Sequence, residues 1–133
     1  MRQVFILDSY CLMASFHDEP SADYLESLIR KARQQECQLK LSLVNWGDIY
    51  YSICRSHHEK AAKEFLLFIE DLPIELIDIN RDLVFEAAQL KSKYRIAYAD
   101  CFAAALAKRE DAPVITGDQE FKALAREIKI HWI

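Results

Sequence analysis

Four aspartates in this sequence stand where a strand has just ended or a helix has just begun. They are Asp8, Asp48, Asp100 and Asp118. Asp8 and Asp118 closely follow short apolar runs that are typical of buried strands, whereas Asp48 and Asp100 lie in the first turns of expected helices. In an open α/β sheet, these positions meet beyond the carboxyl ends of the strands, where ligands bind. We therefore expect the four carboxylates to share one pocket.

Such a pocket has a defined chemistry. Carboxylates that crowd together repel one another and take up protons unless a cation neutralises them. A site made only of oxygen ligands suits a hard cation, Mg²⁺ or Mn²⁺, and such ions bind substrate phosphates. The expected reaction is hydrolysis of a phosphodiester bond by a metal-activated water. Asp8, Asp100 and Asp118 are the expected metal ligands, and Asp48 is expected to support them as a further catalytic acid.

Each aspartate also has a purely structural interpretation. Asp8 and Asp118 can cap the helices that follow them, and Asp48 can lie at the solvated edge of its helix. Asp100 can favour the positive end of a helix dipole. Taken singly, only Asp100 favours a functional role, because its helix face is otherwise made of alanines and a carboxylate there needs a partner. The prediction of a site therefore depends on the shared placement of all four.

Strand and helix patterns alternate along the chain. The expected strands are residues 4–7, 39–43, 74–79, 113–116 and 128–132, and helical spacing of apolar residues fills the segments between them, with a polar break at 55–58. This alternation predicts an α/β fold, a three-layer α/β/α sandwich with a mostly parallel five-stranded sheet. We expect residues 1–133 to form a single domain.

The composition is that of a globular, helix-rich chain, with 52% hydrophobic and 29% charged residues. Its net charge of −4 offers no general attraction to nucleic acid, so RNA would need local cations such as those in 30–33, 55–63 and 91–95. The four cysteines form no C-x-x-C pair and are expected to be free thiols. With no signal peptide and no run of roughly 18 apolar residues, a soluble cytoplasmic protein without a membrane partner is expected.

Two further patterns have unremarkable interpretations. The adjacent His57 and His58 are expected to form an exposed loop pair, because neighbouring helical side chains point some 100° apart and cannot share a metal. The tyrosines and phenylalanines lie mainly on apolar stripes, which favours core positions over a base-stacking surface.

Four segments resemble the PIN-domain family, and more narrowly the VapC-type toxin ribonucleases of type II toxin–antitoxin systems. They are Leu7-Asp8-Ser9, Asn45-Trp46-Gly47-Asp48-Ile49-Tyr50-Tyr51, Tyr98-Ala99-Asp100-Cys101-Phe102-Ala103-Ala104-Ala105-Leu106-Ala107 and Thr116-Gly117-Asp118-Gln119-Glu120-Phe121. The last two are the most specific, and the resemblance covers essentially the whole chain. It places the family's acidic quartet on the four aspartates above, and its hydroxyl and amide helpers on Ser9, Asn45 and Thr116.

The resemblance implies a Mg²⁺- or Mn²⁺-dependent endoribonuclease that forms a homodimer and is silenced by a small antitoxin protein. One residue departs from the family pattern, because Asp48 stands where the family normally has glutamate. Its carboxylate reaches about 1.5 Å less far, which favours water-mediated contact over direct ligation. The alternative, from a different functional class, is a catalytically weak PIN-like module that binds RNA or a protein.

Three other classes of protein fit less well. A receiver domain wants an acidic pair after the first strand, and a haloacid-dehalogenase-like phosphatase wants a second aspartate two residues after the first. Here Asp8 is followed by Ser9 and Tyr10. A nucleotide-binding module needs a glycine-rich loop, and the chain has only two glycines.

Overall fold

The computed structural model, which describes residues 2–133, contains a five-stranded, all-parallel sheet with the strand order β3-β2-β1-β4-β5. The predicted α/β sandwich with a mostly parallel sheet is thereby confirmed. The strands are β1 (Gln3–Leu7), β2 (Cys37–Ser42), β3 (Ile74–Ile77), β4 (Val114–Thr116) and β5 (Ile130–Trp132). The helices are α1 (Ser9–Phe16), α2 (Ala22–Arg33), α3 (Leu43–Ser56), α4 (Glu59–Glu70), α5 (Arg81–Lys93) and α6 (Tyr98–Glu110), with a short 3₁₀ helix η1 (Gln119–Leu124).

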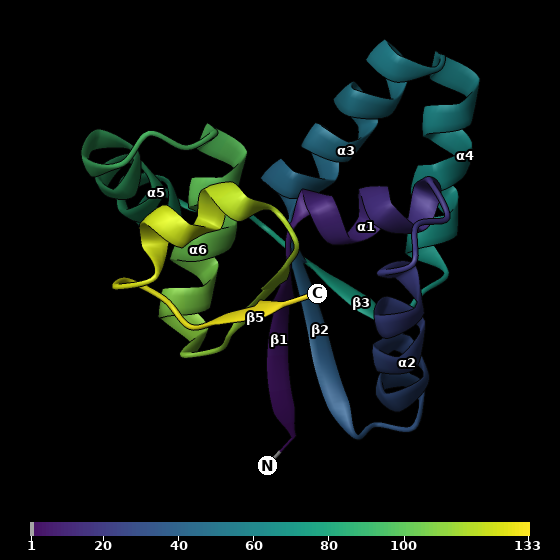
Figure 1. The fold of residues 1–133 in the computed structure, drawn as a ribbon, viewed down its shortest axis with the longest axis horizontal. Helices are drawn as coiled ribbons and strands as arrows, with labels where there is room; N and C mark the ends of the chain where they lie inside the picture. Colours follow the sequence, from purple (N-terminus) through teal and green to yellow (C-terminus); the bar gives the residue numbers. More distant parts are fainter. Residues whose placement is uncertain (1) are drawn as a thin grey trace.

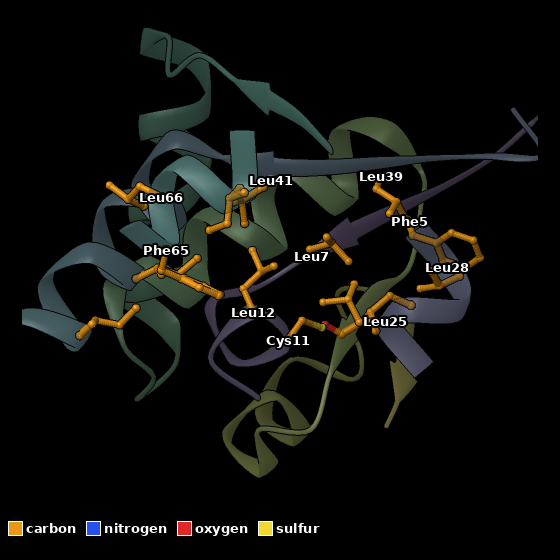
Figure 2. Close-up of a cluster of buried hydrophobic side chains, with 14 of the residues drawn as sticks. Phe5, Leu7, Cys11, Leu12, Leu25, Leu28, Leu39, Leu41, Phe65 and Leu66 are labelled. Atoms are coloured by element: carbon orange, nitrogen blue, oxygen red, sulfur yellow. The ribbon is translucent and has the colours of Figure 1, made fainter. Parts of the chain in front are cut away.

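The central strand β1 separates two hydrophobic cores, because successive side chains of a strand point to opposite faces. Phe5 and Leu7 pack with α1–α4 on one face, whereas Ile6 packs with α5 and α6 on the other. Figure 1 shows α5 and α6 together on one side of the sheet and α1–α4 on the other. Figure 2 shows side chains of the first core converging from β1, β2 and the surrounding helices.

Helix α6 is buried on most of its sides, as its apolar, alanine-rich sequence predicts. Every residue from Cys101 to Ala107 is buried. The helix fits between the sheet and α5, and its small side chains allow this close approach. The start of α6, where Asp100 lies, is thereby fixed firmly against the centre of the sheet.

Several boundaries differ from those predicted. Helix α3 continues to Ser56, and its last backbone hydrogen bond runs from the His57 amide to the Ile53 carbonyl at 2.8 Å. The polar break is therefore confined to His57 and His58, which are both exposed as expected.

The sheet pairing sets the other differences. β2 begins at Cys37 and pairs with β3 only as far as Ile77, and β5 begins at Ile130 because β4 offers three partners. The segment after Asp118 is a 3₁₀ helix rather than an α-helix.

All four cysteines are free, as predicted; Cys54 is partly exposed, and the other three are buried. Within residues 2–133, no helix combines the length and the apolar character that crossing a lipid bilayer requires.

Candidate active site

The candidate site lies at the carboxyl end of the central strands. β1 and β4 are neighbours, and the strand order reverses between them, which is where open α/β sheets bind ligands. Asp8 directly follows β1, and Asp118 lies two residues beyond β4. Asp100 lies in the first turn of α6, as predicted, whereas Asp48 lies in the second turn of α3 rather than the first.

Asp8 caps a helix with one carboxylate oxygen and leaves the other without a partner. It is only 1% exposed, and its Oδ1 accepts a hydrogen bond from the Cys11 amide at 3.0 Å, which caps α1. Its Oδ2 is buried and accepts no hydrogen bond of good geometry, although the Thr116 hydroxyl lies near enough to lower the pKa of Asp8. Burial raises the pKa of Asp8 to about 6, the charge of Asp118 adds to this rise, and Thr116 and Cys11 offset it only in part. A buried carboxylate oxygen without a partner is an atom that a cation would satisfy.

Asp100 stands among the other acids. Its carboxylate oxygen and those of Asp118 and Glu120 lie within 4.8 Å of one another. The pKa of Asp100 is raised to about 7. Burial is the largest cause, and the negative charges of Asp118, Asp8, Glu120 and Asp48, in that order, raise it further. The structure therefore brings all four predicted aspartates into one electrostatic cluster. Their roles as catalytic groups and metal ligands stay predictions.

The sequence reasoning missed Glu120, which is closer to this cluster than Asp48. Asp48 is not among the three acids within 4.8 Å and has the smallest named effect on Asp100. The available signal was the position of Glu120 two residues after Asp118, inside one of the two most specific segments. The Glu120 amide donates to Asp118 Oδ1 at 3.0 Å, and this turn places the two carboxylates together.

Asn45 connects the elements that carry the acids. It is fully buried, and its Nδ2 donates to Ser9 Oγ at 3.1 Å and to the Ala99 carbonyl at 3.2 Å. Its Oδ1 accepts from the Ser42 hydroxyl at 2.6 Å, and Ser42 Oγ in turn caps α3. One amide thus joins the starts of α1, α3 and α6. Sequence reasoning singled out Ser9 and Asn45 but not Ser42.

Thr116 and Gly117 hold the loop that carries Asp118. Thr116 is buried, and its Oγ1 accepts a hydrogen bond from the Asp118 amide at 2.9 Å. Gly117 packs against Tyr10 so closely that an added Cβ would lie 2.4 Å from a ring carbon. A larger residue at position 117 would therefore require the Tyr10 ring to move.

Residues 5–127 match the PIN domain family. This chain belongs to that family, which confirms the resemblance seen in the sequence. The fold of this PIN domain is similar to VapBC2 from Rickettsia felis bound to a DNA fragment from its promoter, with 17% identity, a TM-score of 0.75 and coverage of 97% of this chain and 98% of that one.

Two other solved structures are similar to this PIN domain. A toxin–antitoxin complex from Klebsiella pneumoniae shares 19% identity with a TM-score of 0.66 and covers 96% of this chain and 98% of its own. VapC20 from Mycobacterium tuberculosis, a toxin that cleaves the sarcin–ricin loop, shares 12% identity with a TM-score of 0.69 and covers 90% and 93%. Among curated proteins, none matches this PIN domain significantly. At these identities the similarity establishes the fold.

Proposed function

We propose that this PIN domain is an endoribonuclease that depends on Mg²⁺ or Mn²⁺ and acts as the toxin of a toxin–antitoxin pair. One observation carries the proposal. Acids from four separate parts of the chain converge at one sheet edge, and one of them, Asp8, has a buried oxygen with no partner. An uncompensated cluster of this kind is costly to a fold, and a cation removes the cost.

The donor atoms suit a hard divalent cation, because all of them are carboxylate oxygens. Asp8 and Asp118 each use Oδ1 to bind a backbone amide, which leaves Oδ2 of each for a cation. We propose Asp8, Asp100 and Asp118 as the ligands, with Glu120 beside them and Asp48 as a supporting acid. The raised pKa values of Asp8 and Asp100 are those of carboxylates that need a positive partner.

A bound divalent cation would lower the pKa of a water molecule and stabilise negative charge on the phosphate. The residues of the chain position the ligands for this chemistry. The Cys11 amide orients Asp8, and the Thr116 hydroxyl fixes the backbone of Asp118. With a pKa of about 7, Asp100 carries a proton for part of the time at neutral pH, and its carboxylate must release that proton when a cation binds.

The proposed partners follow from the family and from the similar complexes. We propose RNA as the substrate, a small antitoxin protein as the inhibitor, and a homodimer as the assembly. A toxin that acts on cellular RNA would work in the cytoplasm. Expression of the chain alone in a bacterium should stop growth, and co-expression of an adjacent small gene should restore it.

The direct test is cleavage of a varied pool of RNAs by the purified chain. We expect cleavage with Mg²⁺ or Mn²⁺, none with EDTA, and none by Asp100→Asn. Asp82→Asn, an exposed aspartate on α5, is the matched control and should cleave like the wild type. Undiminished cleavage by Asp100→Asn would refute the site.

The alternative is the catalytically weak binding module, which the shorter Asp48 side chain suggests. That module would bind RNA or a protein but show no metal-stimulated cleavage of any RNA. The presence of Glu120 within the acidic cluster favours the enzyme, because it supplies the longer side chain that Asp48 lacks.

A further inference from the structure

We propose that Tyr51 and Arg55, on the exposed side of α3, form a surface on which single-stranded RNA stacks a base that flanks its scissile phosphate. The proposal depends on the nuclease function proposed for the acidic cluster and names the form of its substrate. Tyr51 is the stacking group, and Arg55 is the cation that accompanies it.

The pair is preorganised at the protein surface. Tyr51 is 54% exposed, although the sequence favoured core positions for the tyrosines. Arg55 Nη1 donates to the Tyr51 hydroxyl at 2.7 Å, and the guanidinium carbon lies 5.5 Å from the centre of the ring. The guanidinium lies over the ring, and the part of the ring that stays exposed is available to a ligand.

The position of the pair connects it to the acidic cluster. Asp48, Tyr51 and Arg55 lie three and seven residues apart, which places them on one face of α3. Asp48 is close enough to Asp100 for its charge to raise that pKa. Arg55 lies about 10 Å further along the helix axis. An RNA strand that enters the cluster can therefore follow this face away from it.

Gly47 supplies an independent observation. It lies one turn before Tyr51, on the side nearer the cluster, and glycine in the middle of a helix is destabilising relative to alanine. A Cβ at Gly47 would meet nothing within 4 Å, so packing does not require a glycine here. The open space instead gives a ligand room to approach the helix beside the ring. Close approach of a ligand is a common reason for a glycine.

The chemistry of the pair fits single-stranded RNA. Proteins hold single strands by stacking bases on aromatic rings and by pairing phosphates with cations, and they prefer unstacked RNA for specific contacts. The chain has a net charge of −4, so a polyanion that approaches the acidic cluster needs a positive charge near its path. Arg55 provides that charge on the same helix face as Asp48.

The first test compares Tyr51→Ala with Tyr51→Phe. We measure the affinity for a fluorescent single-stranded RNA in EDTA, and then KM and kcat with Mn²⁺. Loss of one stacking contact should raise Kd and KM about 5- to 150-fold and leave kcat near the wild-type value. Tyr51→Phe keeps the ring and should retain most of the affinity. Phe85→Ala removes an aromatic side chain on α5 that is 64% exposed and should change nothing.

The second test fills the open space. Leucine is a good helix former, so Gly47→Leu should raise the melting temperature while it weakens binding of single-stranded RNA. A purely structural role for Gly47 would not produce opposite changes in stability and affinity. A blunt RNA duplex should bind the wild type and Tyr51→Ala equally.

The failures of the two proposals are distinguishable. Equal affinity and KM for the wild type and Tyr51→Ala would overturn the stacking surface and leave the nuclease intact. If Tyr51→Ala instead lost affinity only for a co-purified antitoxin, the pair would belong to a protein interface, and the RNA surface would be refuted. If the wild type cleaves no RNA with any metal, the nuclease proposal fails. The affinity for the fluorescent single-stranded RNA, measured in EDTA, still decides whether Tyr51 binds RNA.

Discussion

Removing the charge of Asp100 should stabilise the metal-free protein at alkaline pH. Asp100→Asn keeps the shape of the side chain but abolishes an anion that is buried among four other acids. Burial and these neighbouring charges raise the pKa of Asp100 from 3.8 to about 7 in the folded chain. The ionised form is therefore less stable in the folded state than in the unfolded state.

The magnitude follows from that difference. A rise of the Asp100 pKa from 3.8 to about 7 lowers the free energy of unfolding of the wild type by about 4 kcal/mol at pH 8. Because Glu120 is exposed and the cluster is open to water and salt on that side, we expect about half of this, about 2 kcal/mol. For a chain of this length, that is an increase of about 6–8 °C in melting temperature.

The pH dependence has a defined sign. The pKa of Asp100 is higher in the folded chain than in the unfolded chain. The wild type is therefore most stable below pH 3.8, where Asp100 is protonated in both states, and its free energy of unfolding falls as the pH rises to about 7. The advantage of Asp100→Asn should therefore be absent below pH 4 and complete above pH 7. Urea unfolding in EDTA at several pH values measures this gap, with Asp82→Asn as the control.

With a bound metal ion, the wild type should become more stable than Asp100→Asn. A cation at 100 times its Kd stabilises the wild type by about 2.7 kcal/mol, and Asp100→Asn should gain much less from Mn²⁺. The reasoning is refuted if Asp100→Asn is no more stable than the wild type in EDTA at pH 8. A gap that does not change between pH 4 and pH 8 would equally refute it.

Three other substitutions test parts of the site. Gly117→Ala places a methyl group 2.4 Å from the end of the half-buried Tyr10 side chain, which must move aside, so it should cost about 1 kcal/mol, at the low end for overpacking, and reduce RNA cleavage, as measured by urea unfolding and initial rates. Asn45→Ala removes a buried amide with three side-chain hydrogen bonds and should cost about 2–4 kcal/mol of unfolding free energy. Asp48→Glu restores the family's usual residue, and it should tighten Mn²⁺ binding in isothermal titration calorimetry; unchanged affinity would show that Asp48 does not act on the metal.

Much of the fold was predictable because burial imposes a period on the sequence. The alternation of strand and helix patterns predicted the parallel sheet, and the apolar run before Asp8 predicted its central strand. Strand ends were less predictable, because they depend on how far a neighbour extends. The end of α3 was not predictable either, because the polar run from Arg55 to His58 has no hydrophobic period to mark where the helix stops.

The convergence of the four aspartates was predictable from topology alone, because parallel strands end at one edge. Their relative distances were not. Glu120 was missed because its distance from the aspartates depends on how the chain turns after Asp118. That segment begins a 3₁₀ helix, and carboxylate oxygens of Asp118 and Glu120 lie within 4.8 Å of each other. The exposed ring of Tyr51 was likewise hidden, because helical spacing alone cannot tell which side of α3 meets solvent.

The two oxygens of Asp8 have different surroundings. Oδ1 accepts the hydrogen bond that caps α1, whereas Oδ2 is buried without a partner and is the oxygen that we propose for the metal. In a mutational scan, Asp8 would thus be intolerant for two unrelated reasons, and most replacements would confound them. Asparagine separates them, because its carbonyl oxygen preserves the cap while its amide removes the anion. Loss of activity at Asp8 therefore indicates a role in chemistry only when Asp8→Asn is compared with replacements that also remove the cap.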